Sequence, residues 1–303
     1  MSALPQPIQP APLCSESQLR VIAPSGPFDA ALLRAGLAHL REYQVELDDT
    51  LNCSPAGFLA ATDEMRLSAL QRALDDPQLD AIWIARGGYG LSRILPAVDW
   101  AGFQRQPKWL IGFSDVTALH CAALKSGVMS LHGPNLTSLA ALDAPAFASV
   151  DSMLKGDFSG SSKVRLRALN QTAQSRSGQL LDSQGSCLVG GNLTVLFAEA
   201  AAGRLFVPPD ALLLLEDVAE TSYRCDRMLT ALAQNPALGK LKGVIFGEFK
   251  DCSPGRWDVP IDTVLDEWAE KSPFPVWKEA PVGHGTVNHA FLHGGRPPGW
   301  RLA

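Results

Sequence analysis

Short apolar runs alternate with stretches of helical spacing along the first half of the chain. Five of these runs have the length and content of buried strands: residues 19–23, 43–47, 80–85, 109–113 and 129–134. After the first and second runs, leucines recur every three or four residues behind Asp29 and Thr62, which are residue types that cap helices. Strands that alternate with helices form a parallel sheet covered on both faces. This half of the chain therefore predicts a Rossmann-like α/β fold.

The apolar pattern pauses in a polar stretch at about residues 151–177 and then resumes. Further strands are expected at residues 179–182, 186–189, 211–217, 241–249 and 275–282, with helices from the cap Asn192 to residue 201 and over 223–233. We predict three parts. An N-terminal α/β domain spans 1–155, a linker with one strand at 164–168 spans 156–176, and a smaller β-rich C-terminal domain spans 177–303.

Composition narrows the classes of function. The chain has 303 residues, of which 46% are hydrophobic and 19% charged, as is typical of a globular protein with a full core. Its net charge of −5 and its lack of a basic run argue against nucleic acid or an anionic membrane as partner. No signal peptide or membrane span is indicated, so we expect a cytoplasmic location. The six cysteines are scattered without a C-x-x-C pair, which favours neither a zinc cage nor a disulfide framework.

Ser114 lies at the corner between the strand at 109–113 and a helix with Val116 and Leu119 on its apolar face. A serine at such a corner holds its hydroxyl above the carboxyl end of the sheet, and the N–H of Asp115 points into the same space. This is the geometry of a nucleophile elbow. An alternative stays open, in which Ser114 or Asp115 only caps the helix, because Gly-Phe-Ser-Asp lacks the second glycine of G-x-S-x-G.

The strand at 80–85 ends in a glycine-rich loop, residues 86–90. Glycine lets backbone N–H groups approach a ligand closely at this edge of an α/β sheet. The loop matches neither G-x-x-x-x-G-K-[ST] nor G-x-G-x-x-G, so it is not a phosphate loop. Since the next strand leads to Ser114, we expect the loop beside it, where it would supply a second oxyanion donor. An ordinary tight turn is the alternative.

Two carboxylates and a histidine follow strands of the second half. Glu216 and Asp217 close the run 211–217, and His284 stands between two glycines after the strand 275–282. A hydroxyl nucleophile needs a base, and the base needs a group that fixes its tautomer. The order serine, acid, histidine is that of α/β hydrolases, so an active site between the two domains is expected. Alternation turns Glu216 and Asp217 to opposite faces, and spacing alone does not choose between them.

Two histidine patterns match metal-binding spacings only in part. His39 and Glu42 have the H-x-x-E spacing of zinc carboxypeptidases, but their helix is expected in an outer layer. His284, His289 and His293 follow at irregular intervals without a carboxylate at metal spacing. We therefore expect neither a metal nor a cofactor.

Six short motifs run in order through nearly the whole chain. They are Ile22-Ala-Pro-Ser-Gly26, Ala85-Arg-Gly-Gly-Tyr-Gly90, Ile111-Gly-Phe-Ser-Asp115, Leu188-Val-Gly-Gly-Asn-Leu193, Leu215-Glu-Asp217 and Pro281-Val-Gly-His-Gly285. Together they resemble the L,D-carboxypeptidases (murein tetrapeptide carboxypeptidases), a family that also contains the microcin C self-immunity proteins. The resemblance implies a metal-free serine peptidase, often a homodimer, with an N-terminal parallel sheet and a smaller β-rich C-terminal domain.

The resemblance also assigns roles to residues. It implies that Ser114 is the nucleophile, that His284 is the base and that Glu216, rather than Asp217, orients the histidine. The backbone N–H groups of Asp115 and Gly87 would form the oxyanion hole.

The substrate that the resemblance implies is a cytoplasmic muropeptide of cell-wall recycling. Its terminal D-alanine would be released from the L-centre of meso-diaminopimelate. Arg86 would then pair with the new C-terminal carboxylate, or else serve only as a surface ion pair or backbone support. Two further alternatives stay open: a microcin-immunity-type peptidase that acts on an acyl-sulfamoyl nucleotide, and a non-catalytic α/β protein that binds a small ligand.

Overall fold

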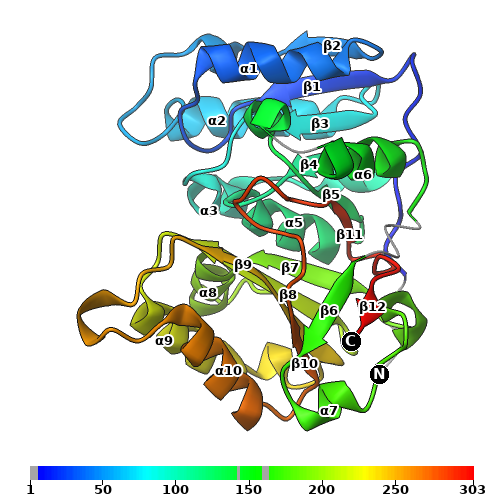
Figure 1. Cartoon of the computed structure of the whole chain (residues 1–303). Coiled ribbons are helices and arrows are strands. Elements are labelled where there is room, and N and C mark those ends of the chain that lie inside the picture. Colours follow the sequence, from blue (N-terminus) through cyan, green and yellow to red (C-terminus); the bar gives the residue numbers. More distant parts are fainter. Residues whose placement is uncertain (1–5, 142–143, 159–163) are drawn as a thin grey trace.

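Two six-stranded sheets form the framework and lie one above the other in Figure 1. The computed structural model describes residues 6–141, 144–158 and 164–303. Most neighbouring strands run parallel, and helices follow most of the strands, which confirms the α/β class. None of the described helices has the length and apolar content to cross a bilayer.

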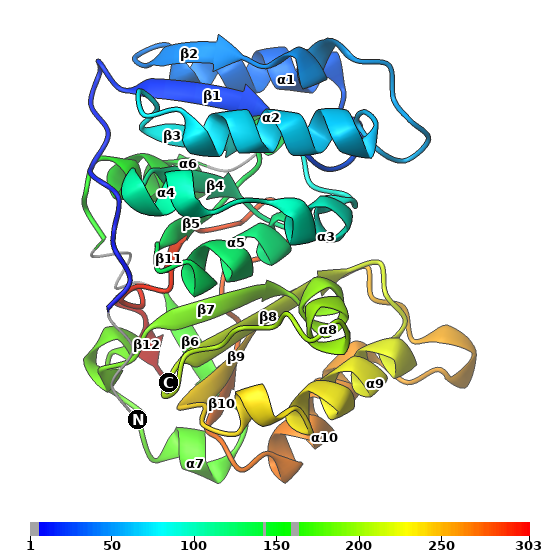
Figure 2. The same cartoon turned by 180° about the vertical axis from the view of Figure 1, so that it is seen from behind.

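The first sheet has the strand order β11-β5-β4-β3-β1-β2. Its strands are β1 (Gln18–Ile22), β2 (Gln44–Leu47), β3 (Ala81–Ile84), β4 (Trp109–Gly112), β5 (Ser130–His132) and β11 (Phe291–His293). Only β11 runs antiparallel to its neighbour, β5. The helices of this half are α1 (Ala30–Leu37), α2 (Asp63–Asp75), α3 (Leu91–Ile94), α4 (Ala101–Arg105), α5 (Val116–Lys125) and α6 (Ala144–Leu154). Figure 2 shows α2, α3, α4 and α5 on one face, while α1 and α6 cover the other.

The central strands of this sheet are buried on both faces. Along β3, Ala81 and Trp83 pack into one apolar cluster, while Ile82 and Ile84 pack into another. Side chains alternate between the two faces of a strand, so a strand covered on both sides is apolar throughout. This explains why the uninterrupted run at 80–85 predicted its strand correctly.

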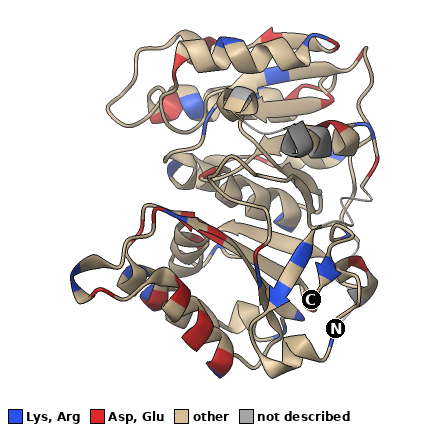
Figure 3. Cartoon of the chain, viewed as in Figure 1, with Lys and Arg blue, Asp and Glu red and all other residues tan. Residues whose placement is uncertain are grey.

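The second sheet has the order β12-β6-β10-β9-β8-β7. Its strands are β6 (Arg165–Ala168), β7 (Leu188–Asn192), β8 (Leu212–Val218), β9 (Gly243–Lys250), β10 (Val276–Lys278) and β12 (Arg301–Leu302). Its helices are α7 (Gln171–Gln174), α8 (Leu193–Ala201), α9 (Ser222–Ala233) and α10 (Ile261–Lys271). Acidic residues mark α10 in Figure 3, and Lys278 of β10 pairs with Asp262 and Asp266 at 2.9 and 3.1 Å.

Two predicted strands of this half are wrong or too long. Residues 179–182 form no strand, because Leu181–Gln184 is a 3₁₀ turn that ends at Gly185 in the left-handed region. The strand expected over 275–282 stops at Lys278, because Glu279 has a φ of 72° and leaves the extended conformation.

The chain crosses between the two halves more than the predicted domains suggest. Strand β6 lies within residues 156–176, the predicted linker, and pairs with β10 and β12. Strand β11 lies within residues 177–303 and adds to the edge of the first sheet. Strand β11 therefore links the two halves of the molecule. The boundaries of the two domains stay a prediction.

Three buried histidines, one each from α5, β5 and β11, lie close together. His120 of α5, His132 of β5 and His293 of β11 are all 0% exposed. The ring of His120 lies 5.3 Å from that of His293 and 5.7 Å from that of His132. His120 bonds Ser130 Oγ at 2.8 Å and the carbonyl of Gly112 at 2.9 Å. Among the described residues, the ring nitrogens of His132 and His293 have no hydrogen-bond partner.

We expect this cluster to make the protein less stable in acid. Burial lowers the pKa of His120 to about 4 and the pKa of His132 and His293 well below the ordinary value. An unfolded histidine titrates near about pH 6.5, so below that pH the unfolded chain binds more protons than the folded one. The contribution of the neutral, buried histidines to the free energy of unfolding is complete above about pH 6.5 and is lost as the pH falls below that value. When the pH has fallen to the folded pKa of His120, the titration of this one residue should have lowered the free energy of unfolding by about 3 kcal/mol.

Replacing His293 with phenylalanine tests this expectation, because the ring is kept and a titrating group is lost. Urea unfolding of both proteins at roughly pH 7.5 and pH 5 gives the difference in their free energies of unfolding. That difference should move in favour of His293→Phe by about 1–2 kcal/mol at the lower pH. A difference that does not change with pH would contradict the expectation.

Candidate functional site

Ser114 stands on a strained turn between β4 and α5. Its φ of 69° lies in the left-handed region, which a residue with a side chain adopts at a cost. At Gly112, where β4 ends, an added Cβ would lie 2.8 Å from Asn135 Oδ1 and 2.9 Å from Val116. The same Asn135 oxygen accepts a hydrogen bond from the N–H of Phe113 at 3.2 Å, which fixes the turn. The sharp strand-to-helix turn predicted at Ser114 is confirmed.

The helix-cap alternative does not hold for Asp115. Although Asp115 occupies the N-cap position of α5, its side chain makes no capping hydrogen bond. Its Oδ2 instead accepts a hydrogen bond from the N–H of Leu91 at 3.0 Å, at the start of α3. Burial raises the pKa of Asp115, and the bond from Leu91 opposes that rise. The carboxyl group therefore ties the turn at Ser114 to the glycine loop.

Gly87 of this loop touches Ser114. A Cβ added at Gly87 would lie 2.9 Å from Ser114 Cβ and 3.1 Å from Ser114 Oγ, so only glycine fits without a shift. The carbonyl of Gly87 accepts a hydrogen bond from the N–H of Gly26 at 3.0 Å, which fixes the loop from the other side. The prediction that the loop lies beside Ser114 is confirmed. A backbone segment this close to the serine meets the first requirement for a donor to negative charge that develops there.

Arg86 supports the backbone near this loop. Its Nη1 donates a hydrogen bond to the carbonyl of Pro27 at 2.6 Å, although the residue as a whole is exposed. Of the two roles considered for Arg86, backbone support is the one that this contact provides.

His284 and Glu216 form a close pair at the carboxyl end of the second sheet. His284 Nδ1 lies 2.7 Å from Glu216 Oε2. The Glu216 side chain is 0% exposed, whereas 17% of the His284 side chain reaches the surface. A buried carboxylate at this distance fixes the N–H on Nδ1 and leaves Nε2 able to accept a proton.

The same histidine lies against the turn that carries Ser114. Its ring centroid is 4.8 Å from that of Phe113, the residue that precedes the serine. Ser114 follows β4 of the upper sheet in Figure 1, while Glu216 lies near the carboxyl end of β8 in the lower sheet. The site therefore lies where the two sheets meet.

Strand β9 holds the loop around His284. The carbonyl of His284 accepts a hydrogen bond from Lys250 Nζ at 3.2 Å. The carboxylate of Glu248 packs against the two flanking glycines, where a Cβ at Gly285 would lie 2.5 Å from Oε2 and one at Gly283 would lie 2.7 Å from Glu248 Cβ. Gly283 also has a φ of 155°, which side chains rarely adopt. The glycines on either side of His284 are therefore required by the packing of this loop.

Asp217 points away from His284. Its Oδ2 accepts hydrogen bonds from the N–H and the hydroxyl of Thr194 at 3.0 and 2.8 Å, and its Oδ1 accepts one from Asn192 Nδ2 at 3.1 Å. It therefore anchors the start of α8. Burial raises the pKa of Asp217, and the bonds from Thr194 oppose that rise. The alternation that separates Glu216 from Asp217 is confirmed.

The two histidine patterns that match metal-binding spacings in part do not form metal sites in the described part of the chain. The His39 ring packs on Phe147 at 4.7 Å, and Glu42 pairs with Lys155 at 3.2 Å. His293 belongs to the buried histidine cluster rather than to the loop of His284. Over residues 6–141, 144–158 and 164–303, no three side chains of metal-binding type are arranged to hold an ion.

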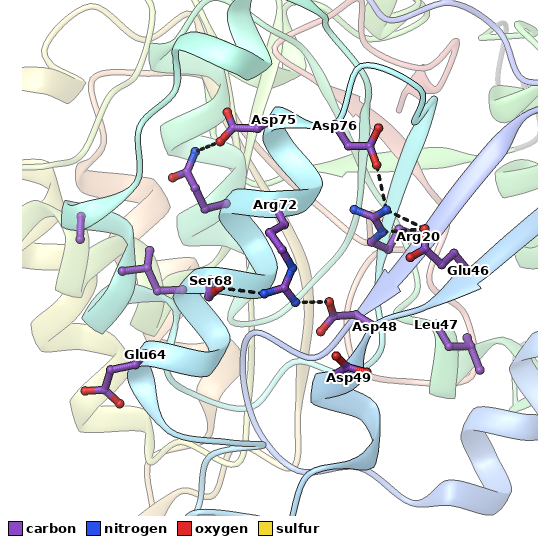
Figure 4. Close-up of a pocket in the computed structure, with 13 residues that line it drawn as sticks. Arg20, Glu46, Leu47, Asp48, Asp49, Glu64, Ser68, Arg72, Asp75 and Asp76 are labelled. Carbon is purple, nitrogen blue, oxygen red and sulfur yellow. Dashed lines mark hydrogen bonds and ion pairs between the residues drawn. The ribbon is translucent and has the colours of Figure 1, made fainter.

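A hollow of about 930 Å³ opens elsewhere, between α2 and the edge strand β2 (Figure 4). Its lining includes none of Ser114, Glu216 and His284. Its two arginines are engaged with carboxylates: Arg20 with Glu46 and Asp76 at 2.6 and 2.8 Å, and Arg72 with Asp48 at 2.7 Å. The pairs of Arg20 with Asp76 and of Arg72 with Asp48 hold α2 to the sheet.

Sequence reasoning missed two supporting residues. Asn135 fixes the turn at Ser114, and Lys250 fixes the loop of His284. Neither stands at a set spacing from the residue that it supports. A polar residue just beyond β5 and a lysine at the end of β9 were the only signals.

Comparisons with known proteins agree with the resemblance. A sequence model described as the LD-carboxypeptidase N-terminal domain matches residues 19–133, and one described as the C-terminal domain matches residues 185–297. A putative carboxypeptidase of Synechocystis sp. is 36% identical over 295 residues, which cover 95% of this chain and 93% of that protein. A murein tetrapeptide carboxypeptidase of Pseudomonas aeruginosa is 32% identical over 292 residues, which cover 92% of each chain.

Solved structures share the fold. The muramoyltetrapeptide carboxypeptidase from Oxalobacter formigenes superposes with a TM-score of 0.74 at 24% identity, over 91% of this chain and 92% of that one. The microcin C7 self-immunity protein MccF, in complex with aspartyl sulfamoyl adenosine, gives 0.76 at 18% identity, over 95% and 94%. Because both family models match and the similar sequences align nearly end to end, the chain belongs to the LD-carboxypeptidase family and is a carboxypeptidase.

Proposed function

We propose that the protein is a metal-free serine L,D-carboxypeptidase that releases terminal D-alanine from cytoplasmic murein tetrapeptides during peptidoglycan recycling. One observation carries the proposal: the 2.7 Å contact between His284 and the buried Glu216, beside the strained turn of Ser114. The relative named murein tetrapeptide carboxypeptidase supports the substrate class. The cytoplasmic location and the homodimer implied by the resemblance stay predictions.

In the proposed reaction Ser114 Oγ attacks the carbonyl carbon of the last peptide bond, and His284 Nε2 takes the hydroxyl proton. Glu216 holds the tautomer of His284 and stabilises the cation that forms. The N–H groups of Gly87 and Asp115 stabilise the oxyanion of the tetrahedral intermediate. His284 then gives its proton to the leaving amine, which departs as the free amino acid. Water hydrolyses the acyl-enzyme by the same steps, so that no metal is required.

In this mechanism, substrate binding must bring the side chains of Ser114 and His284 together. The structure has no hydrogen bond between Ser114 and His284, although both residues lie beside Phe113. Such bonds are often long without substrate and tighten in the complex. The proposal therefore needs the two side chains to come within hydrogen-bond distance once a peptide occupies the site.

Incubation with tetrapeptide muropeptides, followed by mass spectrometry, tests the proposed function. One alanine should be lost from peptides that end in L-diaminopimelyl-D-alanine, and none from a matched control that ends in L-alanine. Equal loss from both peptides, or loss from neither, would contradict the assignment.

A parallel incubation with an acyl-sulfamoyl adenosine addresses the microcin-type alternative. Binding a nucleoside calls for aromatic side chains at the site. Two exposed aromatic residues, Tyr89 and Trp257, instead pack on neighbours, Tyr89 on Phe58 at 5.6 Å and Trp257 on Tyr223 at 4.9 Å. Cleavage of the nucleotide but not of the muropeptide would replace the wall substrate by that alternative.

A further inference from the structure

Cys225 and Cys252 are distant in the sequence and adjacent in the fold. Cys225 lies on α9, and its N–H donates to the carbonyl of Thr221 at 3.1 Å. Cys252 follows β9, and the next residue, Ser253, forms a parallel bridge with Thr221. The carbonyl of Ser253 also accepts hydrogen bonds from the N–H of Ser222 at 2.9 Å and from its hydroxyl at 3.0 Å. These bonds hold the segment after β9 against the first turn of α9, and Cys252 packs there against the apolar cluster that contains Cys225.

The two thiols differ in access and in acidity. Cys225 is 0% exposed within the core of the second half, whereas Cys252 is partly exposed at the edge of that core. The interaction between the two neighbouring thiol groups lowers the pKa of Cys252 and raises the pKa of Cys225. A lower pKa gives a larger thiolate fraction, and the thiolate is the form that reacts with oxidants. Cys252 is thus suited to react first, and Cys225 is placed to react with it second.

We propose that Cys225 and Cys252 are a modification site, which hydrogen peroxide converts into a reversible disulfide. The Cys252 thiolate attacks one peroxide oxygen, so that an S–O bond forms and the O–O bond breaks, and the leaving hydroxide becomes water with the proton that the Cys252 thiol has released. The Cys225 sulfur then attacks the sulfur of Cys252. An S–S bond forms, the S–O bond breaks, and the second hydroxide leaves as water with the proton of Cys225. Two electrons pass from the two sulfurs to the peroxide, and a thiol reductant reverses the change.

The disulfide would lie close to the loop of His284. Lys250, two residues before Cys252, donates to the carbonyl of His284 at 3.2 Å. A covalent link to α9 restrains the chain just after this lysine. The proposal does not rest on the proposed function, because its first readout is the bond itself.

Peptide mapping tests the proposal on the full-length protein. The reduced protein is treated with hydrogen peroxide, its remaining thiols are alkylated, and the digest is analysed without reduction. We expect a cross-linked pair of peptides that carry Cys225 and Cys252, lighter by about 2 Da than the two free peptides together. Dithiothreitol should release both peptides, and Cys53 should be recovered alkylated.

Three variants sharpen the test. In Cys225→Ser, Cys252 should stop at a sulfenic acid that dimedone traps, whereas in Cys252→Ser the buried Cys225 should stay a thiol. Cys53→Ser, which alters a partly exposed cysteine outside the pair, should form the cross-link as the wild type does. Oxidation of Cys252 to sulfinic acid in the wild type without a cross-link would overturn the proposal. So would a cross-link between other cysteines. If Cys225→Ser fails to fold, the wild-type map and Cys252→Ser still decide.

Discussion

Replacing Ser114 with alanine should lower kcat by about a million-fold, because the change removes the proposed nucleophile and leaves the rest of the site in place. The turn itself should persist. Alanine keeps the Cβ that Gly87 already accommodates, and the hydrogen bond from the N–H of Phe113 to Asn135 Oδ1 does not involve the hydroxyl. Circular dichroism and thermal unfolding should therefore match those of the wild type, while product release falls to the background.

His284→Ala provides the companion measurement. Loss of the base should cost about as much as loss of the nucleophile, and the double variant should be little worse than either single one, because the residues act as a unit. Losses that multiply would show that the two residues act separately. A folded Ser114→Ala protein that turns over substrate within about tenfold of the wild type would defeat the serine mechanism.

The sequence predicted the local features of the site for a physical reason. A buried strand, a glycine and a helix start within a few residues determine the turn at Ser114, and no distant residue is needed to recognise it. The same holds for the strand that carries Glu216 and for the alternation that turns Asp217 away. Periodicity reports such short-range geometry directly.

The pairing of Glu216 with His284 is a different kind of result. Glu216 and His284 are 68 positions apart in the sequence. That spacing alone does not predict the 2.7 Å distance between His284 Nδ1 and Glu216 Oε2. The strand-end positions and the order serine, acid, histidine indicated that one of two carboxylates serves His284, and only the resemblance to a known family chose Glu216. Asn135 and Lys250 support the site from other elements and follow no motif, so they emerge only when the strands are arranged in space.

The larger architecture was harder to predict where the chain changes sheets. Strand β11 has only three residues, Phe291–His293, and it belongs to the first sheet although most strands of the second sheet precede it in the chain. Short strands carry little periodicity, and their partners are set by tertiary contacts. The histidine cluster depends on this crossing, because His293 reaches His120 only through β11.

Replacing Glu216 with glutamine should lower kcat by about ten-thousand-fold, less than the loss of the serine or the histidine. The amide is nearly the same shape as the carboxylate but carries no charge. It cannot stabilise the imidazolium cation that forms when His284 takes the proton of Ser114. If its NH₂ group faces Nδ1, it also places the imidazole proton on Nε2, which then cannot act as the base. Steady-state kinetics with the muropeptide substrate measure this loss.

Asp217→Asn is the matched control, because it makes the same chemical change one residue away. Asp217 accepts hydrogen bonds from Thr194 and Asn192 and has no contact with His284. An asparagine there turns one acceptor into a donor that faces other donors, which should cost about 1–3 kcal/mol of stability. The kcat of the folded Asp217→Asn protein should stay close to that of the wild type, and urea unfolding should show the loss of stability. A larger fall in kcat for Asp217→Asn than for Glu216→Gln would show that Asp217, and not Glu216, is the acid of the site.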